Sequence, residues 1–134
     1  MIKHQTTAVA EGYCRPEQIP VDMGYRKDFP LEVRFRFHDE NGSVEWMMAR
    51  DLLANGMLRK QGEGDILIDP SDDGVVRLTL RVLTEHLVIA FNSDDLYRFL
   101  VATYTEVAEG HEWPTVGNAL DEFLSNPENF KEAH

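Results

Sequence analysis

Histidines, one cysteine and adjacent carboxylates are the side chains of this chain that could do catalytic or metal-binding chemistry. The five histidines occur in no His-x-Glu or His-x-x-x-His spacing, and the chain has no Cys-x-x-Cys pair; they are His4, His38, His86, His111 and His134. Cys14 has only Arg15 as a cationic neighbour and no predicted helix N-terminus to activate its thiol. These patterns predict no metal site, no organic cofactor and no cysteine nucleophile.

The glycine-rich and acidic motifs are explained by local structure. Gly62-Glu63-Gly64-Asp65 lacks the Lys-Ser/Thr ending of a phosphate-binding loop and places two acids where a phosphate would lie, so it predicts a turn. Asp94-Asp95 falls at an expected helix N-terminus, where the helix dipole favours negative charge. His111 beside Glu112 is the remaining candidate for an enzyme site, and it lacks a supporting constellation. We therefore expect no enzyme activity.

Four arginines stand out in a chain that has 13 basic and 24 acidic residues and a net charge of −11. Arg34 and Arg36 lie on one predicted strand, and Arg77 and Arg81 lie on another. Together they could form a basic stripe that binds single-stranded nucleic acid, which is the alternative function. The other interpretation is that they pair with acidic residues across the strands, namely Glu32, Glu45 and Glu85. Because the net charge repels phosphate backbones, we expect no nucleic-acid partner.

The chain length of 134 residues predicts a single domain, 1–134. Residues 1–10 are polar and lack the apolar stretch of a signal peptide. No apolar stretch approaches the ~20 residues that span a bilayer. A single cysteine also fits a reducing compartment, so we expect a cytoplasmic protein without membrane insertion.

A hairpin is the clearest predicted element in the first half of the chain. Residues 31–48 alternate with a period of two, which places one set of side chains on a buried face: Leu31, Val33, Phe35 and Phe37, followed by Val44, Trp46 and Met48. The turn contains Asn41-Gly42, a strong hairpin signal. A short helix is expected over 50–58, burying Leu52 and Leu53, with Gly56 closing its end in a left-handed conformation.

Further strands are expected on both sides of this hairpin. Residues 65–68, 75–82 and 85–91 predict a three-stranded meander with a turn over 70–74. Residues 6–13 and 19–25 are expected to be strands, which Pro16 and Pro20 confine to edges or loops.

Two helices are predicted in the last third. One is capped by Asn92 or Ser93, stopped by Gly110, and buries a face that contains Leu96, Phe99, Leu100, Thr103, Tyr104 and Val107. Its second apolar face predicts self-association through Tyr97 and Val101. A short helix over 116–125, within a polar C-terminal segment, adds further candidate interface residues: Leu120, Phe123 and Leu124. The element order predicts an antiparallel α+β fold.

Two segments of the chain carry a family pattern. Residues 44–57 contain a Val-x-Trp strand and an Ala-Arg-Asp-Leu-Leu helix, and residues 62–70 contain a Gly-x-Gly-Asp turn. With matching segments from Ile19 to Tyr25 and at Phe29-Pro30, the pattern resembles the SsgA-like proteins of actinobacteria from about residue 19 to 107. The sequence departs from this pattern at Met48 and Asp69, where the family has an aromatic residue and a tryptophan.

The resemblance implies a non-enzymatic regulator of sporulation-associated septation that lies at division septa and recruits the tubulin-like FtsZ. It also implies a Whirly-like barrel or sandwich with two to three helices, and a ring-like homotrimer. We interpret the matching motif residues as structural: Trp46, Arg50, Asp51, Leu52, Leu53, Gly64 and Asp65. In this interpretation Arg50 and Asp51 open the short helix.

Overall fold

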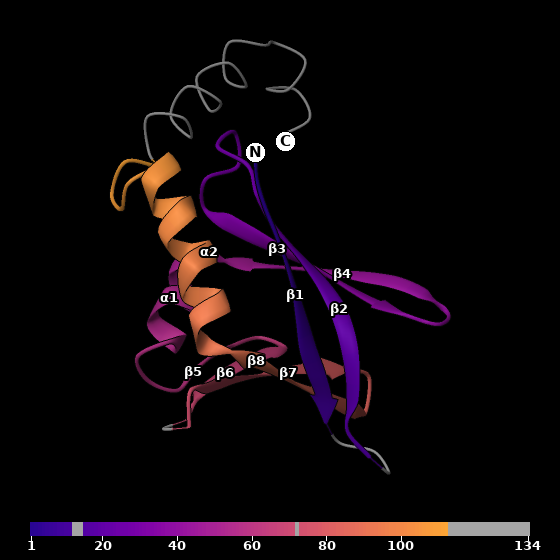
Figure 1. Cartoon of the computed structure of the whole chain (residues 1–134). Coiled ribbons are helices and arrows are strands. Elements are labelled where there is room, and N and C mark those ends of the chain that lie inside the picture. The colour runs from indigo at the N-terminus through magenta and orange to yellow at the C-terminus, as the bar shows by residue number, and fades with distance from the viewer. Residues whose placement is uncertain (12–14, 72, 113–134) are drawn as a thin grey trace, which may run out of the picture.

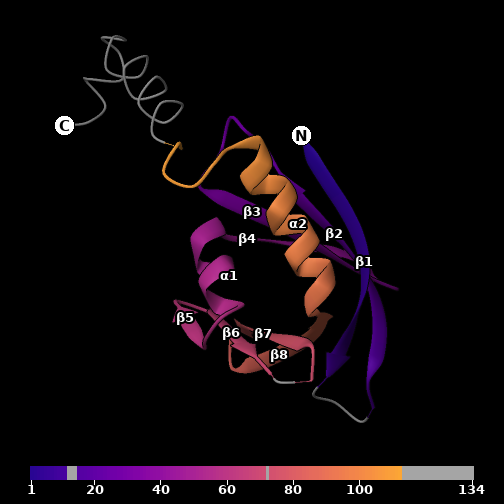
Figure 2. The same cartoon turned by 60° about the vertical axis from the view of Figure 1, so that its left-hand side comes forward.

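Eight antiparallel strands form one curled sheet in the computed structural model, which describes residues 1–11, 15–71 and 73–112. The strands are β1 (Ile2–Glu11), β2 (Glu17–Tyr25), β3 (Glu32–Asp39), β4 (Gly42–Ala49), β5 (Gln61–Glu63), β6 (Ile66–Pro70), β7 (Val75–Val82) and β8 (Glu85–Asn92). Two helices, α1 (Arg50–Gly56) and α2 (Ser93–Glu106), lie on the side toward which the sheet curls (Figures 1 and 2). The strand order is β4-β3-β2-β1-β8-β7-β6-β5.

The predicted antiparallel α+β class is confirmed. The sheet is a half-barrel, open between β4 and β5 in the described part of the chain, in place of the barrel or sandwich that the resemblance implied. The expected Whirly-like fold stays a prediction. The helix expected over 116–125 lies outside the described residues.

The hairpin of β3 and β4 has the predicted antiparallel pairing. Phe35 lies opposite Trp46 and Phe37 lies opposite Val44, across a turn at residues 40–41. The prediction was wrong about the burial of two residues. Leu31, which precedes β3, is 45% exposed, and Val44 on β4 is 57% exposed. Figure 1 shows the reason for Val44: the hairpin projects past the body of the molecule.

The expected confinement of proline to edges was wrong for β2, which lies between β1 and β3. The sheet tolerates Pro20 because pairing of β2 with β3 begins only at Val21, opposite Phe37. Pro20 therefore has a strand neighbour only on the β1 side, opposite Thr7. The predicted meander is confirmed as β6, β7 and β8, and β5 extends it by one strand.

An aromatic cluster packs β3 and β8 against α2. The Phe35 ring contacts those of Phe37, Phe91 and Phe99, with centroid separations of 5.7 to 6.3 Å. The predicted inner face of α2 is confirmed for Leu96, Phe99, Leu100 and Thr103, which are buried. Tyr104 is only partly buried, and Val107 follows the helix, which ends at Glu106 and not near Gly110. Asn92 caps the helix by accepting a hydrogen bond from the Asp94 amide at 2.9 Å.

Gly56 has a different role from the predicted one. It lies in helical conformation at the last position of α1 and has no positive φ. A Cβ atom at this position would lie 2.5 Å from Cγ2 of Ile68 on β6. The glycine therefore allows α1 to approach the sheet closely, a requirement that local turn chemistry does not reveal. Leu53 is buried as expected, whereas Leu52 is only partly buried.

Candidate interaction surfaces

A buried guanidinium group connects α1 to the end of α2. Arg50 is 1% exposed. Its Nη1 donates hydrogen bonds to the carbonyls of Thr103 and Val107, at 3.0 and 2.7 Å, and its Nη2 donates to Glu112 Oε1 at 2.7 Å. Cations near a helix C-terminus satisfy its free carbonyls and complement its dipole. Arg50 is the first residue of α1, as predicted, but its side chain stabilises the last turn of α2.

Two tyrosine rings enclose this guanidinium group. The Arg50 Cζ atom lies 3.9 Å from the centroid of Tyr104 and 5.0 Å from that of Tyr25. The Tyr104 hydroxyl donates a hydrogen bond to Asp51 Oδ1 at 2.9 Å. Burial, together with this carboxylate, raises the pKa of Tyr104 well above its ordinary value of 10.0. Both charged motif residues therefore hold α2 in place.

The ionised form of Glu112 is stabilised despite its burial. Burial is the largest single effect and acts to raise the pKa of this carboxyl, but the hydrogen bond and charge of Arg50, together with backbone hydrogen bonds, outweigh it and hold the pKa below 4.5. Glu112 is thus a partner of Arg50, and the pairing with His111 considered from the sequence is a neighbour relation only. No local sequence pattern at Arg50 or at Glu112 reveals this contact, because the two residues are 62 positions apart.

The remaining motif residues make contacts within the fold. Gly64 has a φ of +58°, which suits the first central position of the tight turn between β5 and β6. The Asp65 carbonyl accepts a hydrogen bond from the Arg81 amide at 2.9 Å. Trp46 is partly buried and packs against the core cluster.

The outer face of β1 to β4 has a hollow whose lining includes charges of both signs. Its volume is about 310 Å³, and its lining includes Gly24, Lys3, Arg34, Arg36 and Glu45. Arg36 pairs with Glu45 at 2.8 Å. Arg34 lies 3.3 Å from Glu32 and 3.8 Å from Glu45. Carboxylates therefore compensate both guanidinium groups on this face.

A histidine and a carboxylate lie together on the same face. His38 Nε2 is 2.7 Å from Asp22 Oδ2. The hydrogen bond with His38 is the main reason that the pKa of Asp22 lies below 3.8. His4, by contrast, packs edge-on against Phe99, with ring centroids 5.6 Å apart. Among the described residues, no group of three or more His, Cys, Asp or Glu side chains could hold a metal ion.

Arg77 and Arg81 lie on β7, apart from the arginines of β3. The strand order places β2, β1 and β8 between them, so the four arginines do not form one continuous stripe. Arg77 Nε donates to Glu11 Oε1 at 2.9 Å. The pattern that suggested single-strand binding is therefore divided between two regions, and Arg34, Arg36 and Arg77 pair with acids.

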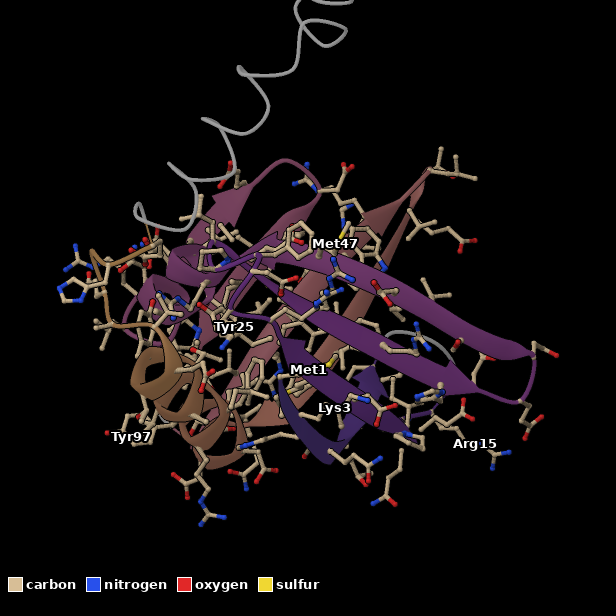
Figure 3. All side chains as sticks on the ribbon, turned by 90° about the horizontal axis from the view of Figure 1, so that it is seen from above. Met1, Lys3, Arg15, Tyr25, Met47 and Tyr97 are labelled. Atoms are coloured by element: carbon tan, nitrogen blue, oxygen red, sulfur yellow. The ribbon has the colours of Figure 1, made fainter. Side chains whose placement is uncertain are left out.

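Two apolar side chains that the sequence assigns to a second face of α2 are exposed, beside charged residues that include Asp94 and Arg98. Tyr97 is 63% exposed and Val101 is 46% exposed. Figure 3 shows Tyr97 on α2 well apart from Met47 on β4, so these residues belong to separate surfaces. Leu120, Phe123 and Leu124 lie outside the described residues. No helix in the described ranges is long and apolar enough to cross a membrane.

Comparison with known families identifies a match over residues 19–112, to a family described as Streptomyces sporulation and cell division protein, SsgA. One relative is the sporulation-specific cell division protein SsgB of Saccharopolyspora erythraea. It is 34% identical over 128 residues, covering 92% of this chain and 86% of the relative. The protein of the same name from Streptomyces coelicolor is 36% identical over 100 residues, covering 70% of this chain and 73% of its own.

Solved structures show the same fold. A crystal structure of an SsgA-like sporulation-specific cell division protein from Thermobifida fusca has a TM-score of 0.83 and 30% identity, and the match covers 90% of this chain and 91% of that one. A second structure, from work that relates mutations in SsgB to longitudinal cell division during sporulation of Streptomyces coelicolor, has a TM-score of 0.79 and 27% identity. That match covers 85% of this chain and 94% of the other.

Proposed function

The chain belongs to the SsgA family of sporulation and cell division proteins, and on this premise we propose that it helps position or recruit the FtsZ septation machinery during sporulation-associated division. Its relatives named SsgB support a role in cell division. The observation that carries the proposal is their similarity over most of both chains, together with the shared fold. We propose a non-enzymatic regulator that acts in the cytoplasm, at division septa.

Contacts between proteins are the proposed mode of action. The exposed apolar residues of α2, Tyr97 and Val101, form the candidate surface for assembly into a homo-oligomer, for which the family resemblance suggests a trimer. An oligomer presents several copies of one weak partner site, which raises the avidity for a polymeric target. Nucleic-acid binding is not proposed, since the arginines are divided between β3 and β7.

Co-sedimentation with assembled FtsZ polymers tests the proposal directly. The full chain should pellet with the polymers and stay in the supernatant without them. A fluorescent fusion expressed in a sporulating actinobacterium should gather at septa. A chain that neither pellets with polymers nor gathers at septa would contradict the proposed role.

A further inference from the structure

The turn between β7 and β8 has a leucine where the backbone favours glycine. Leu83 and Thr84 connect Val82 to Glu85, and Leu83 has a φ of +56°. Two-residue hairpin turns with a positive φ at the first central position normally carry glycine there, because a side chain is strained in that conformation. Among the described residues, every other one with a positive φ is a glycine.

The β5–β6 hairpin shows the residue that local turn chemistry favours. Glu63 pairs with Ile66 across this turn, and Gly64 occupies the same turn position as Leu83, with a φ of +58°. Leu83 is 98% exposed, so burial within its own chain does not offset the backbone strain. Strained positions that the fold itself does not explain are typical of functional sites.

The tip of the β7–β8 hairpin projects beyond its neighbouring strands. Pairing of β7 with β6 ends at Leu80, and pairing of β8 with β1 ends at Val88. Residues 82–86 lie beyond both pairings, and all of them are exposed. Val82, which precedes the strained leucine, is 47% exposed. Val82 and Leu83 therefore form an apolar tip on a projecting pair of strands.

A cation borders this apolar tip. Arg81 is exposed, and within the described ranges its guanidinium group has neither an ion pair nor a hydrogen bond. Arg77 on the same strand, by contrast, pairs with Glu11. The nearby carboxylate of Glu85 has an interaction of its own. A free guanidinium group beside an apolar tip fits a partner that has a carboxylate at the rim of an apolar pocket.

A protein pocket fits this tip better than a lipid surface does. The net charge of the chain is −11, so anionic lipid headgroups repel it. Two apolar side chains also bury too little surface for membrane anchoring, since even one myristoyl chain binds a bilayer only marginally. A pocket in a protein, in contrast, encloses a single leucine and excludes water from the ion pair beside it.

We propose that Leu83 anchors the chain to its partner in division, with Leu83 in an apolar pocket of that partner and Arg81 paired with a carboxylate at the rim. This inference rests on the proposed function, because the partner is the polymer that the chain is proposed to bind. The strained turn presents the whole leucine side chain to the partner, and Val82 adds apolar contact at the base of the tip.

Replacing the leucine by glycine separates a binding role from a structural role. Leu83→Gly introduces the residue that the β5–β6 turn uses, so it should raise the Tm by about 2 to 5 °C. The same change should weaken co-sedimentation with FtsZ polymers about tenfold, because the anchor is lost. Leu58→Gly is the matched control, since Leu58 is 81% exposed and has no positive φ. It should leave polymer binding unchanged and should not raise the Tm.

A second pair of variants tests the charge beside the tip. Arg81→Gln should weaken polymer binding about fivefold and make the remaining binding less sensitive to salt. Arg59→Gln changes an exposed arginine of another loop and should leave both properties unchanged. Circular dichroism checks that the variants are folded.

The outcomes distinguish this inference from the proposed function. If the unaltered chain and Leu83→Gly pellet equally well with the polymers, the anchor is wrong and the proposed function stands. An unaltered chain that does not pellet would contradict the proposed function and this inference with it. A Tm that does not rise in Leu83→Gly would remove the strain from which the inference starts.

Two further measurements test other occupants of the tip. Binding to phosphatidylglycerol vesicles that Leu83→Gly abolishes would assign the tip to a lipid surface. A lower mass of Leu83→Gly in light scattering would assign the tip to contact with a second copy of the chain. Either result would overturn the proposal.

Discussion

Arg50 Nη2 lies 2.7 Å from Glu112 Oε1, in a buried ion pair whose side chains are 1% and 5% exposed. The same guanidinium group reaches the last carbonyls of α2, and its Nε has no hydrogen-bond partner. A buried charge that loses its only partner destabilises a protein strongly. This pair therefore controls how α1, α2 and the chain at residue 112 are joined.

Replacing Arg50 should strongly lower the stability of the folded protein. Arg50→Met should lower the free energy of unfolding by about 3 kcal/mol, because it leaves the Glu112 carboxylate buried without its ion-pair partner. Urea denaturation followed by circular dichroism measures the change. Arg26→Met is the matched control, since its pair with Asp28 is largely exposed and should contribute little. Equal effects of the two variants would contradict the assigned role.

Stability should depend on pH through Glu112. Because the pKa of Glu112 in the folded state lies below its ordinary value of 4.5, its ionised form stabilises the fold above about pH 4.5. This contribution is lost as the pH falls through the lower, folded-state pKa. Glu112→Gln should therefore flatten the pH dependence of unfolding in that acidic range. An unchanged pH profile would show that Arg50 does not stabilise this carboxylate.

A methyl group at Gly56 should not be tolerated. Gly56→Ala places a Cβ against Cγ2 and Cβ of Ile68, at 2.5 and 2.7 Å, so α1 must move away from β6. We expect a loss of about 1 to 3 kcal/mol in the free energy of unfolding. Gly24→Ala is the control, because a Cβ there meets nothing within 4 Å. Thermal unfolding should show a lower Tm for Gly56→Ala than for Gly24→Ala if close packing against Ile68 requires the glycine. Equal Tm values for the two variants would contradict that role.

Self-association should depend on the outer face of α2. Light scattering on the purified chain should report a mass above 15.4 kDa. Replacing Tyr97 and Val101 by lysine should reduce the mass to that of a monomer and leave the circular dichroism spectrum unchanged. Leu83→Lys, which alters an exposed leucine on another hairpin, should not change the mass. A monomer at all concentrations would argue against assembly through this face.

Single-stranded nucleic acid should bind only weakly. Fluorescence anisotropy with labelled strands should give a Kd of about 10⁻⁴ M or weaker at physiological salt, the level of a generic basic patch. Submicromolar binding that is lost when Arg34, Arg36, Arg77 and Arg81 are replaced by alanine would restore the alternative function.

Much of the fold can be predicted from the sequence because the relevant signals are local. The period of two around Phe35 and the turn at Asn41 predict the β3–β4 pairing, and the period of 3.6 after Asn92 predicts α2. Side-chain periodicity and turn chemistry depend on residues only a few positions apart. The curling of the sheet is different, because it depends on how all strands twist and pack together. The family resemblance implied a barrel or sandwich, and a half-barrel is observed.

The sequence by itself determined most of the elements, the buried face of α2 and the family. Only the tertiary structure decided which distant residues meet: Arg50 with Thr103 and Glu112, and Gly56 with Ile68. It also decided that Arg34 and Arg77 lie on strands separated by three others. Residues far apart in the chain come together through strand order and helix docking, which are set by the burial of the whole core. No pattern within a short window of sequence contains that information.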